Sequence, residues 1–259
     1  MNEYISRLRD GMRGNMYDNY IFDLYGTLVD IHTNESKASL WKYMAGYMTL
    51  QGASYTGPEL CKRYRALIGA QRLARHEKYV AQFPGLSPDE IEVDLSQVFS
   101  CLYSEKGITP SPQMLADWAL MYRTLSLQHL RLFEGAEALL SGLRRLGKRV
   151  YLLSNAQRLF TEPELRHLGI YDLFDDVLIS SDIGFMKPSP RFYGALLKKH
   201  QLDPKASVMI GNDWQADAWG AYNCGLASMY VHTAQSPEVT GQLPPGCRRL
   251  NTVLDALSS

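Results

Sequence analysis

Polar side chains that could form an active site follow apolar segments at widely separated points of the chain. Asp23 comes directly after the run Asn19-Tyr20-Ile21-Phe22 and just before a glycine turn. The others, in chain order, are Ser154, Asn155, Lys187, Asp213 and Asp217. A carboxylate becomes a workable nucleophile when it is held in line with its target and shielded from water. One nucleophile, one hydroxyl, one cation and two further acids therefore predict an active site.

The two late acids, Asp213 and Asp217, predict a site for a hard cation together with Asp23. Mg²⁺ prefers oxygen ligands and keeps several waters, and it could shield the charge of a phosphate group. Neighbouring carboxylates repel each other unless a cation binds between them. We expect Asp213 to be the direct ligand, and Asp217 to act through water or by orienting Lys187. Asp213 could also cap the helix that follows it.

The elements that must position these residues alternate between strands and helices. Short apolar runs predict strands at 20–24, 149–153, 177–180, 207–210 and 228–231. Helical periodicity predicts helices at 134–146, 164–168, 190–200 and 214–224. This alternation predicts an α/β fold, a Rossmann-like parallel sheet with helices on both faces. Ligands of such sheets bind beyond the carboxyl ends of the strands, where the polar residues lie.

More than a hundred residues separate the first strand from the second, and this interval has a helical pattern. Four helices are expected, at 39–50, 58–83, 88–106 and 112–127, with aromatic residues as their core. We predict an inserted α-helical cap domain at 33–130, a core at 16–32 and 131–259, and an N-terminal extension at 1–15. The cap should join the core by crossings near 31–34 and 128–133. A cap of this kind can close over a pocket and exclude water.

Composition excludes several classes of partner. The chain has 259 residues, of which 46% are hydrophobic, and its 27 basic and 27 acidic residues cancel. No overall field would attract nucleic acid or an anionic membrane, and no apolar stretch is long enough to span a bilayer. The polar start lacks the apolar core of a secretion signal, so we expect a cytoplasmic protein. The four scattered cysteines predict neither disulfides nor a zinc site.

The motifs resemble those of the haloacid dehalogenase-like hydrolase superfamily over most of the chain after Met16. The matching pieces are Phe22-Asp23-Leu24-Tyr25-Gly26-Thr27-Leu28, Leu153-Ser154-Asn155, Lys187-Pro188, and Ile210-Gly211-Asn212-Asp213 with Asp217. The resemblance implies a covalent aspartyl intermediate on Asp23 and phosphate binding by Ser154, Asn155 and Thr27. It also implies a catalytic Lys187, and a metal ligand in the backbone carbonyl of Tyr25.

Tyr25 departs from the pattern of the phosphatases in this superfamily, which usually carry a second aspartate there to protonate the leaving alcohol. A phenol with an ordinary pKa of about 10 does this poorly near neutral pH, although His32 or a cap residue could assist. The first motif is similar instead to that of the 2-haloacid dehalogenases, whose leaving halide needs no proton. That branch works without metal and places an arginine about thirty residues after the nucleophile, whereas none lies between Arg13 and Arg63 here.

We therefore predict a Mg²⁺-dependent phosphatase of the helical-cap branch that acts on a small phosphorylated metabolite. A phosphatase acting on a good leaving group would not need the missing aspartate. Two alternatives remain, a metal-free 2-haloacid dehalogenase and a catalytically weak relative that binds a metabolite through the same pocket. We expect no nucleic-acid or membrane partner, and the helical insert could present the surface of a homodimer.

Overall fold

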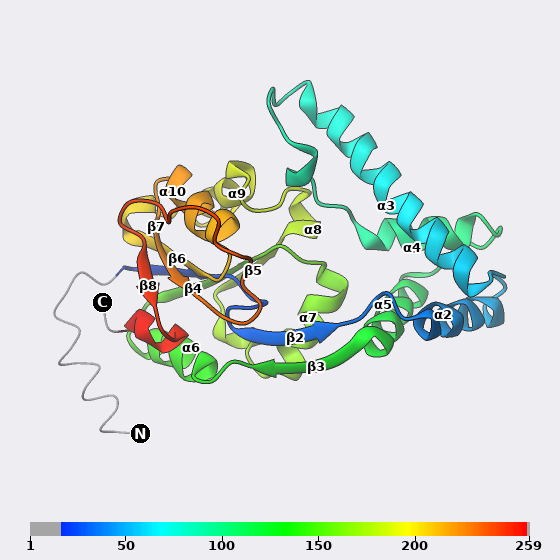
Figure 1. Ribbon diagram of the computed structural model, residues 1–259, viewed down its shortest axis with the longest axis horizontal. Coiled ribbons are helices and arrows are strands. Elements are labelled where there is room, and N and C mark those ends of the chain that lie inside the picture. Colours follow the sequence, from blue (N-terminus) through cyan, green and yellow to red (C-terminus); the bar gives the residue numbers. More distant parts are fainter. Residues whose placement is uncertain (1–16, 258–259) are drawn as a thin grey trace.

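The computed structural model describes residues 17–257 and contains a six-stranded sheet, with the helices of residues 38–126 to one side of it (Figure 1). The strand order is β5-β4-β1-β6-β7-β8, and every neighbouring pair is parallel. The strands are β1 Asn19–Phe22, β4 Arg149–Ser154, β5 Asp176–Ile179, β6 Ser207–Gly211, β7 Ala227–Val231 and β8 Arg248–Leu250. The predicted α/β fold is confirmed. The N-terminal extension and Met16 lie outside the described residues.

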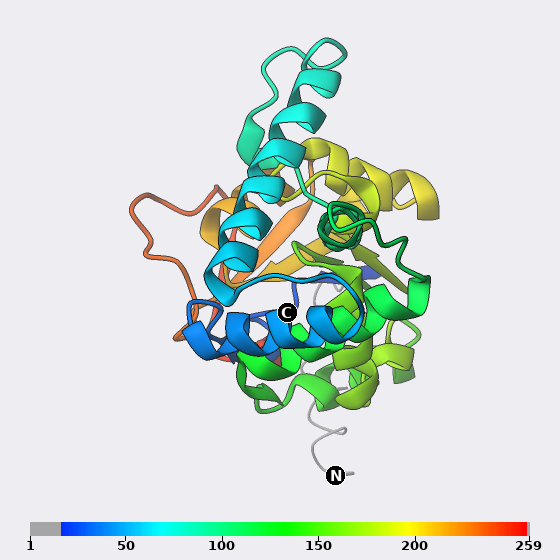
Figure 2. The ribbon, with the colours of Figure 1, turned by 90° about the vertical axis from the view of Figure 1, so that its right-hand side faces the viewer.

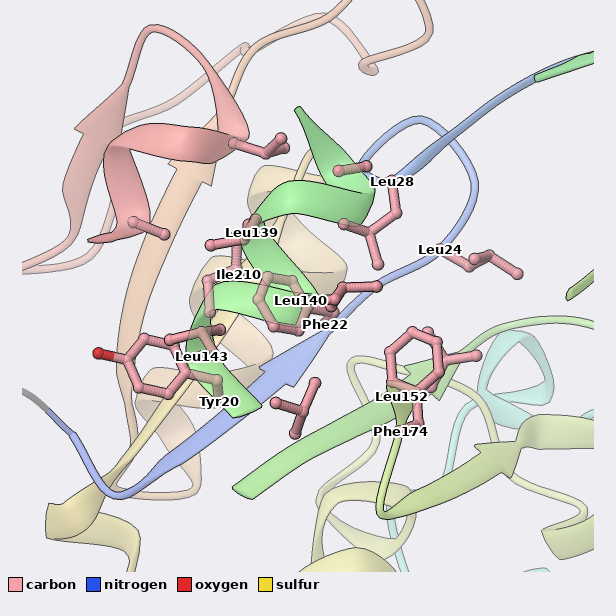
Figure 3. Close-up of a cluster of buried hydrophobic side chains, with 14 of the residues drawn as sticks. Tyr20, Phe22, Leu24, Leu28, Leu139, Leu140, Leu143, Leu152, Phe174 and Ile210 are labelled. Carbon is pink, nitrogen blue, oxygen red and sulfur yellow. The ribbon is translucent and has the colours of Figure 1, made fainter. Parts of the chain in front are cut away.

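Alternating side chains cover the two faces of the sheet. On β1, Tyr20 and Phe22 enter one apolar cluster while Ile21 enters another. Figure 3 shows the first cluster, where leucines of helix α6 (Ala136–Arg145) lie over Tyr20 and Phe22. Phe192 and Leu196 of helix α9 (Pro190–His200) pack with Ile21 on the opposite face. Burial on both faces explains why the strands are continuous apolar runs.

The helices of the core agree with their predicted positions in most cases. They are α6 Ala136–Arg145, α7 Arg158–His167, α8 Ser180–Ile183, α9 Pro190–His200 and α10 Gly220–Asn223. Short helical turns are η2 Tyr171–Leu173, η3 Pro204–Ala206 and η5 Val253–Leu257, and η4 Trp214–Trp219 is a π-helix that leads into α10. The expected helix at 164–168 was too short because α7 begins six residues earlier and contains Pro163.

The insert comprises α2 Ala38–Leu50, α3 Gly57–Val80, α4 Leu95–Ser104 and α5 Pro112–Ser126, which pack around another apolar cluster that also includes Phe160 of α7. Trp118 and Tyr122 are stacked at its centre, with ring centroids 5.2 Å apart. Figure 2 views the molecule from this side and shows α2 and α3 in front of the core. We refer to residues 33–130 as the cap.

The two crossings between cap and core form an antiparallel ribbon, which the sequence analysis did not predict. Strand β2 Val29–Thr33 pairs with β3 Leu127–Leu132 along the edge of the molecule (Figure 1). The Asp30 carboxylate on β2 is hydrogen-bonded to His129 at 2.8 Å and forms an ion pair with Arg131 at 2.7 Å, both on β3. The ribbon arises because segments separated by about a hundred residues meet, and neither segment alone indicates that partner.

A second attachment joins the cap to the core near the short turn η1 Pro88–Glu90. Ile91 forms a β-bridge with Phe185, in which the Glu92 amide donates to the Gly184 carbonyl at 3.0 Å. The side chain of Gln157 donates to the Val93 carbonyl at 2.8 Å and accepts from the Leu95 amide at 3.0 Å. The cap therefore meets the core here as well as at the ribbon, and α5 also packs against α7, where Tyr122 stacks on Phe160. No helix of the described part of the chain is long and apolar enough to cross a membrane.

Candidate active site

Lys187 joins two carboxylates at the carboxyl ends of the strands. Its ammonium group donates to Asp23 Oδ1 and to Asp217 Oδ1, both at 2.7 Å. Asp23 directly follows β1, Asp217 lies on η4 after β6, and Lys187 lies in the loop after α8. Lys187 and Asp217 are only 4% and 2% exposed, so the ion pairs are shielded from water. Residues remote in sequence thus meet in one place.

The nucleophile candidate Asp23 is held by the turn that follows it. The hydroxyl of Thr27 lies 3.0 Å from Asp23 Oδ2 and 3.2 Å from the amide oxygen of Asn212. Gly26, in this turn, adopts φ +84, and a side chain there would collide with Asn212. Thr27 is fully buried behind Asp23. This position allows Thr27 to orient the Asp23 carboxylate. We predicted instead that Thr27 contacts phosphate.

The loop after β4 supplies a hydroxyl and an amide with different surroundings. The side chain of Asn155 donates to the Lys187 carbonyl at 2.9 Å and accepts from the Lys187 amide at 2.7 Å, so it fixes the backbone that carries the cation. Ser154 Oγ is buried and has no hydrogen-bond partner among residues 17–257, and its residue lines the same cavity as Asp23. A buried hydroxyl without a partner is costly, and an oxygen atom of a substrate could satisfy it.

Asp213 and Asp217 have separate surroundings although they are four residues apart. Asp213 caps η4, since its Oδ1 accepts from the amides of Gln215 and Ala216 at 2.9 Å. Asp217 Oδ2 accepts from the Asp213 amide at 2.9 Å, and its other oxygen accepts from Lys187. Both oxygens of Asp217 are therefore engaged, whereas Asp213 is partly exposed in the cavity. This arrangement favours Asp213 over Asp217 as a metal ligand.

A cavity of about 190 Å³ opens above these residues. Its lining comprises Asp23, Tyr25, Ser154, Asn155, Lys187, Asn212, Asp213, Ala216, Asp217, Gln235 and Pro237. The three acids and the one lysine give a formal charge of −2. All of these residues belong to the core. Gln235 and Pro237 come from the loop after β7, and nothing in the sequence pointed to that loop.

Burial and charge pairing change the proton affinity of the two central groups. Burial alone would lower the pKa of Lys187, but Asp217 and Asp23 raise it above its ordinary value. Burial raises the pKa of Asp217, and Lys187 partly opposes this effect. The ammonium form of Lys187 is therefore stabilised. It can supply a fixed positive charge to the cavity.

Tyr25 lines the cavity, but its hydroxyl is directed to helix α7. It donates to Glu164 and lies 3.1 Å from Thr161 Oγ1. Burial and the neighbouring Glu164 raise the pKa of Tyr25 far above its ordinary value. His32, considered above as an assisting group, is exposed on β2 and stacks on His129 at 6.0 Å. Neither side chain is placed to give a proton to a substrate in the cavity.

The oxygen donors around the cavity are suitable for Mg²⁺ in chemical type. Asp23 and Asp213 offer carboxylates and Asn212 an amide oxygen, and Mg²⁺ in proteins commonly takes one or two carboxylates with waters and phosphate oxygens. Among residues 17–257, no three His, Cys, Asp or Glu side chains are grouped closely enough to hold a metal on their own. The predicted ligand set of three aspartates therefore does not form a preassembled site.

Residues 17–225 match the family model of haloacid dehalogenase-like hydrolases, and the chain belongs to this family. It is 31% identical over 122 residues to the glyceraldehyde 3-phosphate phosphatase of Methanothermobacter thermautotrophicus, covering 47% of this chain and 54% of that protein. It is 33% identical over 107 residues to the phosphoserine phosphatase of Thermus thermophilus, covering 41% and 43%. The matches to these curated relatives span about half of their length.

Solved structures of the same fold include a magnesium-bound HAD-hydrolase and a haloacid dehalogenase. The HAD-hydrolase YfnB of Bacillus subtilis, bound to magnesium, has a TM-score of 0.51 at 20% identity and covers 92% of this chain and 96% of its own. The L-2-haloacid dehalogenase of Xanthobacter autotrophicus has a TM-score of 0.52 at 18% identity, covering 93% and 97%. The predicted family and fold are confirmed, and the fold alone does not separate the two activities.

Proposed function

We propose that this protein is a Mg²⁺-dependent phosphatase of a small phosphorylated metabolite, acting through an aspartyl-phosphate on Asp23. One observation carries the proposal: the cavity holds Asp23, Asp213 and Asp217 against the single cation Lys187. A phosphate dianion would be repelled by this formal charge of −2 unless a divalent cation offset it. The two curated relatives named above are both phosphatases, which supports the same reaction.

Each residue of the cavity then has a defined task. Asp23, Asp213, Asn212 and the carbonyl of Tyr25 would hold Mg²⁺, which supplies charge neutralisation and polarises the phosphoryl group. Thr27 orients the Asp23 carboxylate and Asn155 holds the backbone of Lys187. Lys187 and the free hydroxyl of Ser154 would bind phosphoryl oxygens. Asp217 keeps Lys187 in place.

The dehalogenase alternative has weaker support. In the part of the chain that the structure describes, no arginine lines the cavity and could receive a halide. A cytoplasmic location and a homodimer stay predictions.

The test is release of phosphate from a panel that includes glyceraldehyde 3-phosphate, phosphoserine and 4-nitrophenyl phosphate. We expect turnover with Mg²⁺, loss of it in EDTA, and loss by at least about 10³-fold in Asp23→Asn and Asp213→Asn. The exposed Asp172→Asn serves as the matched control. Equal phosphate release with and without EDTA would contradict the role of the metal. Chloride release from 2-chloropropionate in EDTA would favour the dehalogenase.

A further inference from the structure

The hydroxyl of Tyr25 belongs to a chain of contacts that leads away from the cavity. It donates to Glu164 Oε2, and the other oxygen of Glu164 pairs with Arg123 Nε at 2.8 Å. Arg123 is on cap helix α5, and its guanidinium lies 4.3 Å from the ring centre of Phe160 on α7. This network joins three elements: the turn that follows Asp23, α7 and α5. Its Glu164 and Arg123 side chains are 7% and 16% exposed.

The network explains why the tyrosine hydroxyl does not serve the reaction. Giving its proton to a leaving group would require Tyr25 to turn away from Glu164. That movement would remove the hydrogen bond that Tyr25 donates to the buried carboxylate of Glu164, and a buried polar group that loses its partner is costly. The structure therefore gives Tyr25 a positioning role: it fixes the turn that carries Asp23 against the helix that contacts the cap.

The remaining groups around the cavity do not replace the missing acid. Lys187 already donates to two carboxylates that favour its charged form. Asp217 accepts hydrogen bonds at both of its oxygens, and Asp213 Oδ1 accepts two from backbone amides, so these oxygens are directed to the protein. Among the described residues that line the cavity, no side chain is thus placed to donate a proton to a departing oxygen.

We infer that the preferred substrates are acyl, enol or aryl phosphates, whose leaving groups are stable as anions, and not phosphate esters of simple alcohols. This inference rests on the proposed function and narrows it to a class of substrate. A poor leaving group needs a proton in the transition state, and general acid catalysis typically contributes 10²–10⁴-fold. Without that contribution, the rate of cleavage should fall steeply as the leaving group becomes more basic.

The proposed steps balance without a protein acid. An oxygen of the Asp23 carboxylate forms a bond to phosphorus while the bond from phosphorus to the leaving oxygen breaks. The electron pair departs with that oxygen as a carboxylate, enolate or phenolate. Water then attacks phosphorus, the bond to Asp23 breaks, and its electrons restore the carboxylate. Both protons of this water remain on the phosphate, which leaves as the dihydrogen monoanion.

The test measures kcat/KM in the presence of Mg²⁺ for acetyl phosphate, a series of substituted phenyl phosphates and glycerol 2-phosphate. We expect kcat/KM to fall steeply as the leaving group becomes more basic, with glycerol 2-phosphate at least about 100-fold below 4-nitrophenyl phosphate. The variant Tyr25→Phe removes the hydroxyl and keeps the ring. It should lower kcat/KM for all substrates by a similar factor. The slope of log kcat/KM against the leaving-group pKa should then stay unchanged. In the double variant Tyr25→Asp/Glu164→Gln, the new acid should raise the rate on glycerol 2-phosphate selectively and flatten the slope.

Two results would overturn the inference while leaving the phosphatase proposal intact. One is that kcat/KM of the wild type hardly depends on the basicity of the leaving group. The other is that Tyr25→Phe lowers kcat/KM for glycerol 2-phosphate but not for 4-nitrophenyl phosphate, because the tyrosine would then be the acid. If no phosphate ester or anhydride is cleaved, the proposed function and the inference fall together. Thermal unfolding shows which variants fold. If the double variant does not fold, the leaving-group dependence of the wild type and of Tyr25→Phe still decides the question.

Discussion

Single residues at the strand ends set the geometry of the site, and Gly211 is the most constrained of them. A Cβ atom added at Gly211 would lie 2.1 Å from Asp217 Oδ2. This glycine therefore allows the carboxylate that holds Lys187 to lie against the end of β6. The sequence alone shows only a glycine before Asn212. The need for it appears when Asp217 folds back from η4.

We predict that Gly211→Ala destabilises the protein by about 1–3 kcal/mol, because overpacking must displace Asp217. Displacement of Asp217 should also move Lys187 and reduce phosphatase activity. Urea denaturation and steady-state kinetics measure the two effects. The control is Gly194→Ala in α9, where an added Cβ meets nothing within 4 Å. That change should stabilise the helix by about 0.5–1 kcal/mol. Similar stability of the two variants would contradict the prediction.

At the scale of elements, the loop of Lys187 is braced by the cap. The Met186 amide donates to the Glu90 carbonyl at 2.8 Å, next to the Ile91–Phe185 bridge. Gln157 adds two hydrogen bonds to the backbone of the same cap segment. Opening of the cap at this end would therefore disturb the loop that carries Lys187. Cap position and Lys187 position are physically linked.

We predict that Gln157→Leu loosens this attachment without unfolding the cap, since it removes two hydrogen bonds to backbone groups, each worth about 1 kcal/mol. Amide hydrogen exchange should become faster in residues 90–95 and stay unchanged in α2. The exposed Gln242→Leu in the loop after β7 provides a control of the same chemistry. Unchanged exchange in residues 90–95 would show that Gln157 does not hold the cap.

For the whole molecule, the buried carboxyl of Glu92 makes the union of cap and core dependent on pH. Glu92 accepts from Ser180 Oγ of the core at 2.6 Å and is 6% exposed. Burial raises its pKa above the ordinary value of 4.5, although Ser180 and the arginines Arg72 and Arg75 oppose this. The folded protein therefore retains this proton to a higher pH than the unfolded chain does. The resulting stability is fully present below the unfolded pKa and is lost as pH rises through the folded pKa.

We predict that Glu92→Gln, which cannot ionise, gains stability relative to the wild type as pH rises from about 4 to about 7. Chemical denaturation across this pH range measures the free energy of unfolding of both proteins. Groups that titrate in the same way in both proteins cancel in the difference between the two free energies. The exposed Glu137→Gln on α6 should show no such trend. A constant difference between Glu92→Gln and the wild type would exclude the buried carboxyl as the cause.

The sequence was sufficient for what depends on local pattern and chain order. Buried parallel strands are continuous apolar runs, so five of the six strands of the sheet were predicted to within about two residues. The carboxyl ends of parallel strands share one edge of the sheet. The sequence therefore predicted that Asp23, Ser154, Lys187 and Asp213 lie together, and all four line the same cavity. The family was confirmed on the same motifs.

Only the tertiary structure decided which atoms these residues offer to a ligand. Asn155 and Thr27 were predicted to meet phosphate, yet they hold Lys187 and Asp23. Tyr25 could be recognised as unusual from its type, but its partner Glu164 lies 139 positions away. The ribbon β2–β3 and the contribution of Gln235 to the cavity are likewise contacts between distant segments. A side chain's type is a local property, whereas its hydrogen-bond partners depend on which distant segments the packed core brings beside it.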